Sequence, residues 1–239
     1  MGALEGKTVV LTGASRGIGR SLAVRLAAEG ARLGLCGRDE AALLQLAEEL
    51  ETPVVTAAFD LCEEELLLEF LEGVRTALGG VDVLVNNAGF NPRKAPLADV
   101  ATAEFDSILA VNLRAPFLLM RELAGDMKAQ GAGHVINILS TVCHSDMETM
   151  GAYTAAKEGL RALTNVFRKE VLEDGSYRLY VAVSAKGGAP PPEDLVKYVI
   201  MGKSTIVLAR LKEVGGKSLH INNKKSKLKK AKVKRMRSG

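Results

Sequence analysis

Short apolar runs rich in β-branched residues alternate along the chain with longer segments whose apolar residues recur every three or four positions. The first run, residues 7–12, ends at Gly13, and residues 17–29 then carry apolar residues at helical spacing before Gly30. This pattern predicts a strand, a turn and a helix. The alternation continues, predicting strands over residues 32–36, 54–59, 81–86, 134–139 and 178–184, and helices over residues 40–50, 63–78, 103–130 and 152–172.

Repeated strand–helix units with apolar strands predict an α/β fold. The strands should form a doubly wound parallel sheet in three layers, covered by helices on both faces. Each crossover should be right-handed, and a ligand should bind beyond the carboxyl ends of the strands. We therefore expect a single domain over residues 1–216 with its binding site beyond the carboxyl ends of the strands.

Composition agrees with a globular protein. The 239 residues are 47% hydrophobic and 25% charged, which excludes a disordered chain or a small disulfide scaffold. No run of about 18 apolar residues predicts a membrane span, and the first residues lack the pattern of a signal peptide. Three widely spaced cysteines favour reduced thiols over a disulfide framework or a metal site. These features predict a cytoplasmic protein.

Charge divides the chain into two parts. Residues 217–239 contain ten Lys or Arg and no acidic residue, whereas residues 1–216 hold 22 basic and 28 acidic side chains, a net charge of −6. A block of like charge cannot bury enough apolar surface to order alone, so a disordered tail is predicted. Nucleic acid, an anionic membrane surface or a nuclear-import receptor are its candidate partners, and a solvated tail with no specific partner is the alternative.

The first predicted turn has the chemistry of a phosphate site. Three glycines lie where a strand leads into a helix, so backbone N–H groups can approach an anion without obstruction by Cβ atoms. The helix amino end adds partial positive charge. We expect the pyrophosphate of a dinucleotide cofactor to contact Gly13, Ser15, Arg16, Gly17, Ile18 and Gly19.

These motifs together resemble the short-chain dehydrogenase/reductase family. The spacing Gly-x-x-x-Gly-x-Gly is followed in order by Asn86-Asn87-Ala88-Gly89, by Asn112, and by Ser140 with Tyr153 and Lys157. The resemblance covers residues 5–185 and implies a Rossmann-type sheet of strand order 3-2-1-4-5-6-7. Residues 204–210 are the candidate seventh strand.

The residues after the second predicted strand bear on cofactor choice. An acidic residue there would bind the adenosine ribose and repel a 2′-phosphate, but this chain has Gly37-Arg38-Asp39. The presence of Arg38 and Arg16 at these positions resembles the NADP-preferring members of the family, whose arginines pair with the 2′-phosphate. NADP (NADPH) is therefore expected as the cofactor, and NAD is less favoured. Alternatively, Arg38 is a solvated residue and Asp39 merely caps the next helix. By resemblance Asp60 and Leu61 contact adenine, and Asn87, Ala88 and Gly89 line the adenosine side of the cleft.

Tyr153 and Lys157 are four residues apart in a predicted helix and share one face. The side chain of tyrosine has an unperturbed pKa of about 10. For it to act as an acid–base catalyst near neutral pH, its phenolate must be stabilised preferentially by about 4 kcal/mol. A neighbouring ammonium and the positive nicotinamide of the oxidised cofactor can supply much of it. The resemblance implies that Tyr153 is the acid–base group, that Ser140 binds the reacting oxygen, and that Lys157 holds the nicotinamide ribose.

Asn112 completes the catalytic group of the family. Pro116 lies four residues later and has no N–H, so the Asn112 carbonyl loses its intrahelical donor. That carbonyl is free to bind a water molecule, and the resemblance implies that this water links Lys157 to solvent as a proton relay.

The carboxyl-terminal third departs from the family. Members usually follow the sixth strand with Pro-Gly and a segment that covers the nicotinamide, but here Lys186-Gly187 leads almost directly into Pro190-Pro191-Pro192. This lid is expected to be missing, which would expose the site to water or admit bulky substrates.

Two functions follow from these observations. The first is an NADP-dependent oxidoreductase that transfers a hydride between the nicotinamide and a ketone, an aldehyde or the corresponding secondary alcohol, with 3-oxoacyl thioesters, steroids, quinones and simple ketones all open. The alternative is a non-catalytic dinucleotide-binding protein whose tail binds an acidic partner. By resemblance a homodimer or homotetramer is expected, and the basic tail makes a nuclear location the alternative to the cytoplasm.

Overall fold

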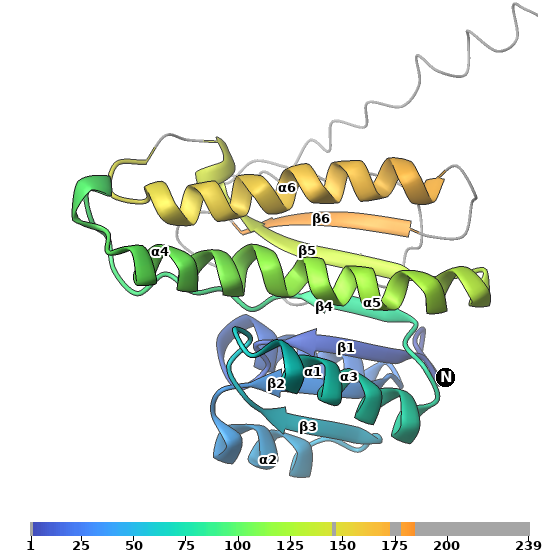
Figure 1. Ribbon diagram of the computed structural model, residues 1–239. Coiled ribbons are helices and arrows are strands. Elements are labelled where there is room, and N and C mark those ends of the chain that lie inside the picture. The colour runs from blue at the N-terminus through green and yellow to red at the C-terminus, as the bar shows by residue number, and fades with distance from the viewer. Residues whose placement is uncertain (1, 145–146, 173–177, 185–239) are drawn as a thin grey trace, which may run out of the picture.

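The computed structural model describes residues 2–144, 147–172 and 178–184, which form a parallel sheet between two layers of helices (Figure 1). The order of the six strands within it is β3-β2-β1-β4-β5-β6. The strands are β1 (Thr8–Thr12), β2 (Arg32–Gly37), β3 (Val54–Ala58), β4 (Val83–Asn86), β5 (His134–Ser140) and β6 (Arg178–Ser184). The helices are α1 (Gly17–Ala28), α2 (Glu40–Glu48), α3 (Glu64–Leu78), α4 (Thr102–Leu109), α5 (Ala115–Gln130) and α6 (Gly151–Leu172).

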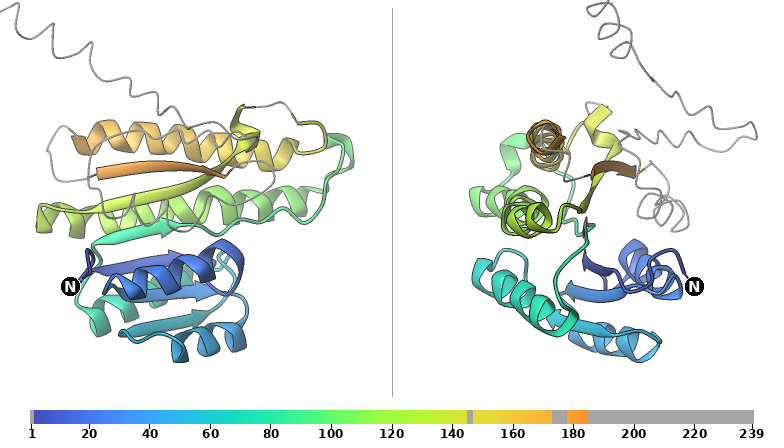
Figure 2. Two further views of the ribbon diagram at one scale, coloured as in Figure 1. Left: turned by 180° about the vertical axis from the view of Figure 1, so that it is seen from behind. Right: turned by 90° about the vertical axis from the view of Figure 1, so that its right-hand side faces the viewer.

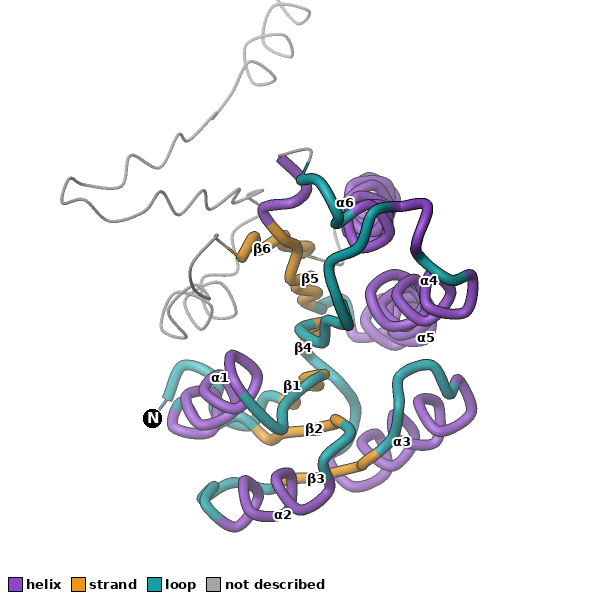
Figure 3. Tube along the Cα trace, turned by 90° about the vertical axis from the view of Figure 1, so that its left-hand side faces the viewer, coloured by secondary structure: helices purple, strands orange, loops and turns teal. Residues whose placement is uncertain are grey.

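The alternation of side chains along each strand builds two cores. On β1, Val9 and Leu11 join the cluster that contains residues of α1 and α2, whereas Val10 joins the cluster with residues of α3, α5 and α6. Successive strand residues point to opposite faces of a sheet, so an apolar strand must be covered on both sides. Figures 2 and 3 show the resulting three layers, with α1 and α2 on one face and α3, α5 and α6 on the other. The predicted Rossmann-type α/β architecture is confirmed.

The strand order reverses at β1, and this reversal determines where a ligand can bind. β1 pairs in parallel with β2 through Val9 and Leu33, and on its other side with β4 through Val9 and Val83. The connections from β1 and β4 therefore leave toward opposite faces of the sheet. In doubly wound sheets, such a switch point at the carboxyl ends of the strands is where a ligand binds.

The predicted helix over residues 103–130 is helical throughout, but not α-helical throughout. The chain forms α4, then a π-helical turn over Ala110–Arg114, and then α5. Pro116 lacks the N–H that would continue the α-helical ladder to Asn112, and a π turn is a common local answer to such an interruption. Asn112 lies in the middle of that turn.

The predictions for the carboxyl-terminal third lie outside the described residues. They comprise the seventh strand over residues 204–210, the missing lid, the domain limit at residue 216 and the basic tail over residues 217–239. Within the described part of the chain, no helix combines the length and the hydropathy needed to span a membrane.

Candidate active site

The turn between β1 and α1 forms a cradle lined by backbone. Gly13 and Gly17 have φ of 69° and 57°, values that favour glycine, and α1 begins at Gly17. Among the described residues no side chain caps the amino end of α1, and its first turn contains no acidic residue. Its first N–H groups and the positive end of its dipole are therefore available to an anion.

Two of the glycines are required by close contacts. A Cβ at Gly19 would lie 2.0 Å from the Gly13 carbonyl oxygen, and a Cβ at Gly13 would lie 2.9 Å from the Ala88 Cα. Both neighbours are backbone atoms, which cannot move aside as a side chain can. The turn thus packs directly on the segment after β4, and its residues fit the pyrophosphate of a dinucleotide.

Thr12 joins the turn to the segment after β4. The backbone N–H groups of Asn87 and Ala88 both donate to Thr12 Oγ1, at 3.1 and 3.0 Å, and Asn87 Nδ2 donates to the carbonyls of Thr12 and Gly13. Thr12 was missed as a site residue in the sequence, although a hydroxyl residue directly before a glycine turn was a usable signal.

The predicted adenosine side of the cleft lies at the ends of β2 and β3. Arg38 follows β2, and its side chain is 59% exposed. The guanidinium carbon lies 5.6 Å from the centroid of the Phe90 ring, and Nη1 lies 4.0 Å from Asp60 Oδ2. Asp39 caps α2 by accepting a hydrogen bond from the Ala42 N–H at 3.0 Å. Asp39 thus has the capping role considered as the alternative, and the Arg38 guanidinium beside it contacts Phe90 and Asp60.

The other residues predicted on this side are distributed around the same edge. Asp60 Oδ1 accepts a hydrogen bond from the Cys62 N–H at 3.0 Å, and Leu61 is buried. Ser15 lies against the backbone of Gly37, where a Cβ would come within 3.2 Å of Ser15 Oγ. Arg16 is exposed at the amino end of α1.

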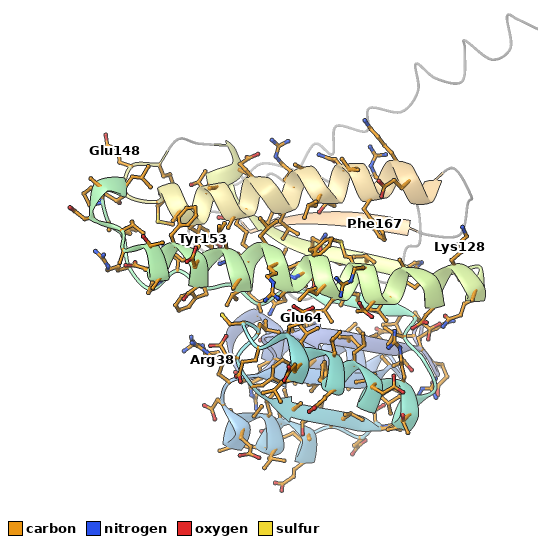
Figure 4. All side chains as sticks on the ribbon, viewed as in Figure 1. Arg38, Glu64, Lys128, Glu148, Tyr153 and Phe167 are labelled. Carbon is orange, nitrogen blue, oxygen red and sulfur yellow. The ribbon has the colours of Figure 1, made fainter. Side chains whose placement is uncertain are left out.

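Ser140, Tyr153 and Lys157 come together at the carboxyl end of β5. Figure 4 shows Tyr153 and Arg38 toward the same end of the molecule, with Lys128 at the opposite end. Ser140 and Tyr153 share a side-chain hydrogen bond. Lys157 Nζ donates to the Ile138 carbonyl at 3.0 Å and lies 5.8 Å from the centroid of the Tyr153 ring. The predicted catalytic side chains thus occupy one small region.

Burial sets the protonation of this region. It lowers the pKa of Lys157 to about 8, because the ammonium is almost fully removed from water. Burial also raises the pKa of Tyr153, and the hydrogen bond with Ser140 opposes that rise. Among the effects of the protein's own residues on the pKa of Tyr153, desolvation is the largest.

Asn112 anchors the loop after β4 through its side chain. Its Nδ2 donates to the carbonyls of Phe90 and Ile108, at 2.7 and 2.9 Å, and its Oδ1 accepts from the Phe90 N–H at 3.2 Å. A Cβ at Gly89 would lie 3.6 Å from Asn112 Oδ1 and 4.0 Å from the Tyr153 hydroxyl. Gly89 therefore lies near the Tyr153 hydroxyl, whereas Asn87 and Ala88 lie against the glycine turn.

Phe90 is a second residue that sequence reasoning missed. It is held by Asn112 and packs against the buried cluster of Ile108, Ala152 and Ala156, while its ring faces Arg38. No local pattern marks it, because its contacts come from three distant segments. Among the described residues no group of three or more His, Cys, Asp or Glu side chains is placed to hold a metal ion.

A switch point beside a glycine-lined turn defines an α/β protein of the dinucleotide-binding class. Residues 7–188 match the family model of the short chain dehydrogenases. The chain therefore belongs to the short-chain dehydrogenase/reductase family of NAD(P)-dependent oxidoreductases, which act on CH–OH or carbonyl groups.

Individual relatives agree with this assignment. Levodione reductase of Leifsonia aquatica is 33% identical over 193 residues, covering 78% of this chain and 70% of the relative. D-xylose 1-dehydrogenase of Caulobacter vibrioides is 33% identical over 210 residues, covering 87% and 82%. A metagenomic short-chain oxidoreductase solved in complex with NADP is 35% identical, with a TM-score of 0.78 over 86% of this chain and 96% of that chain.

Proposed function

We propose that the protein is an NADP-dependent oxidoreductase that interconverts a ketone or aldehyde with the corresponding alcohol. The observation that carries the proposal is the hydrogen-bonded Ser140–Tyr153 pair beside the buried Lys157, at the end of the sheet where the glycine turn lies. A hydroxyl acid–base group, a second hydroxyl to hold the reacting oxygen and a nearby cation are the groups that carbonyl reduction requires.

The chain's own residues would divide the work as follows. The turn over residues 13–19 would hold the pyrophosphate, and Lys157 the nicotinamide ribose. When bound, the nicotinamide supplies or accepts the hydride. Ser140 would donate a hydrogen bond to the substrate oxygen, and Tyr153 would deliver the proton in reduction or take it up in oxidation. A bound positive nicotinamide would favour the phenolate, against the effect of burial.

Asn112 would contribute to the same site through a bound water molecule. Its side chain is committed to Phe90 and Ile108, so its proposed water-binding role rests with the backbone carbonyl in the π-helical turn. Lys157 would exchange its proton through that water. The substrate remains open, because the relatives include reductases and dehydrogenases of different substrates, a ketoacyl reductase among them.

Preference for NADP is supported by Arg38. Its exposed guanidinium extends past the end of β2, where a 2′-phosphate would pair with it, and no acidic side chain ends that strand. The relative solved with NADP adds to this support. Asp60, at 4.0 Å, faces the same guanidinium and would compete weakly for it.

The test is a titration of NADPH and NADH into the purified protein, followed by a panel of carbonyl substrates. NADPH should bind at least about tenfold more tightly than NADH, and Arg38→Ser should remove that difference without weakening NADH. Arg32→Ser, at the opposite end of β2, is the matched control and should keep the ratio. Equal binding of both cofactors by the wild type would refute the NADP preference, and binding without turnover of any carbonyl would favour the non-catalytic alternative.

A homodimer or homotetramer is also proposed. Phe117 on α5 and Val166 on α6 are 41% and 52% exposed, an arrangement that association of these helices would bury. Light scattering during gel filtration should give a multiple of the chain mass, and a monomer at micromolar concentration would refute it. A cytoplasmic location and an anionic partner for the basic tail stay predictions of the sequence.

A further inference from the structure

Three buried polar side chains connect β4, β5 and α6, and the last two of these elements carry Ser140 and Tyr153. Asn86, Asn137 and Thr164 are between 0% and 2% exposed. Asn86 Nδ2 donates to Asn137 Oδ1 at 2.8 Å, Asn137 Nδ2 donates to Thr164 Oγ1 at 2.8 Å, and Thr164 Oγ1 donates to the Leu160 carbonyl at 2.6 Å. Polar groups in a core are costly unless paired, so these bonds favour one arrangement of the three elements.

Thr164 lies on the catalytic face of α6. It follows Lys157 by seven residues and Tyr153 by eleven, which is about two and three helical turns, so all three side chains point in nearly the same direction. Lys157 binds the Ile138 carbonyl, and Thr164 binds the side chain of the preceding residue, Asn137. Neighbouring residues of β5 therefore hold α6 at two points.

These hydrogen bonds give α6 directional contacts, which its apolar contacts do not provide. Leu160, between the two points, is fully buried, and Met120 Sδ accepts a second, longer hydrogen bond from Asn137 Nδ2 at 3.4 Å. Apolar burial has no direction, so it tolerates small rotations and shifts of a helix on a sheet. A hydrogen bond at 2.8 Å depends on both distance and angle. The two polar contacts thus add a directional restraint on the rotation and axial position of α6.

The strand that carries Asn86 also contacts the glycine turn through its next residue. Asn86 pairs with Asn137 in the register of β4 and β5, and the next residue, Asn87, binds the carbonyls of Thr12 and Gly13. Two sets of polar contacts, joined through the backbone between Asn86 and Asn87, consequently link the glycine turn, β4, β5 and α6. They join the two parts of the site that must stay aligned for hydride and proton transfer.

We propose that Thr164, acting through Asn137, is a positioning residue for the reaction, because it holds α6 where the Tyr153 hydroxyl meets Ser140. The role rests on the proposed function of Ser140 and Tyr153, and Thr164 itself touches neither cofactor nor substrate. A misplacement of about 1 Å at reacting groups can cost about a hundredfold in rate. Loss of one buried bond in α6 therefore matters to the reaction as well as to stability.

The first test compares three variants of the full chain in the presence of NADPH. Thr164→Val keeps the side-chain shape and removes the hydroxyl, so kcat should fall at least about tenfold while the KM for NADPH stays within about twofold. Thr164→Ser restores the hydroxyl and should recover most of kcat. Thr8→Val is the matched control, because the fully buried Thr8 also loses a hydrogen bond, from Oγ1 to the Leu78 carbonyl at 3.1 Å, at the other end of the sheet. Its kcat should match the wild type.

The second test does not require turnover. The phenolate of Tyr153 is titrated by ultraviolet absorbance, with Tyr153→Phe in the same background as the blank. Because the Ser140 hydrogen bond lowers the pKa of Tyr153, a weakened contact in Thr164→Val should raise the titration midpoint by about half a pH unit or more. Thr164→Ser and Thr8→Val should leave it in place.

The two tests separate this role from the proposed function. A wild type that reduces no carbonyl would refute the function, and the titration alone would then decide whether Thr164 positions Tyr153. An unshifted midpoint in Thr164→Val overturns the positioning role, whatever happens to kcat. An equal loss of kcat in Thr8→Val, or no recovery in Thr164→Ser, also overturns it, because either result would mean that lost stability explains the effect.

Discussion

Lys157 should make the stability of the protein depend on pH in a way that one substitution removes. Burial lowers the pKa of Lys157 from 10.5 to about 8 in the folded chain. Between these values the unfolded chain binds the proton and the folded chain does not, so the free energy of unfolding rises with pH in that range. This gain in the free energy of unfolding is fully present above pH 10.5 and is lost as the pH falls through about 8.

The size of the effect follows from linkage. The difference between the pKa values of Lys157 in the unfolded and folded chains corresponds to about 3 kcal/mol in the free energy of unfolding. About 2 kcal/mol of this change falls between about pH 7 and about pH 9.5. Lys157→Met removes the titrating group and keeps a long apolar side chain. It also loses the hydrogen bond to the Ile138 carbonyl, which lowers stability at every pH by a similar amount. The pH-dependent part of the difference therefore isolates the buried ammonium.

The assay is urea unfolding of the wild type and of Lys157→Met at both pH values, monitored by circular dichroism. From the lower to the higher pH the wild type should gain about 2 kcal/mol relative to the variant. Lys7→Met, which replaces a lysine side chain that is 53% exposed, is the control and should show no such gain. A difference between wild type and Lys157→Met that stays constant within about 0.5 kcal/mol would refute the argument from burial.

Three further substitutions test the packing of the turn and the helices. Gly19→Ala should abolish measurable NADPH binding in calorimetry, because its Cβ would lie 2.0 Å from the Gly13 carbonyl oxygen, and binding like the wild type would contradict the cradle. Thr12→Val should lower the free energy of unfolding by about 2–4 kcal/mol, since two part-buried N–H groups lose their acceptor, and a loss below about 0.5 kcal/mol would contradict that accounting. Gly73→Ala, in the exposed interior of α3 with nothing within 4 Å of the new Cβ, should raise Tm by about 2–4 °C in calorimetry, and a lower Tm would show an unrecognised contact.

The fold was predictable because its causes are local. The alternation on β1 and the helical spacing after Gly17 each follow from burial of one strand or helix face, and the structure has these elements within a few residues of their predicted ends. The π-helical turn within the predicted helix over residues 103–130 was the exception. Pro116 was recognised as removing a donor to Asn112, but whether a helix answers by a kink, a break or a π turn depends on packing that the local sequence does not contain.

The candidate site was predictable as a set of residues but not as a set of contacts. Ser140, Tyr153 and Lys157 are near in sequence and come from a strand and the next helix, so their meeting follows from topology. The hydrogen bond between Asn112 and Phe90 joins residues 22 positions apart, and the one between Asn137 and Thr164 joins residues 27 positions apart. Such pairs depend on how separate elements pack, which a single sequence does not encode locally. The pKa of Tyr153 could likewise not be predicted from the local sequence, because its desolvation arises only in the assembled core.

The proton-transfer role of Tyr153 is tested most directly by single-turnover reduction of a carbonyl substrate by NADPH-saturated protein, with wild type and Tyr153→Phe compared. The account predicts a loss of about a hundredfold to ten-thousandfold in the rate of nicotinamide oxidation for the variant. NADPH affinity should stay within about twofold, because Phe keeps the ring that packs beside Lys157. Equal rates in the two proteins would contradict the assignment of Tyr153 as the proton donor.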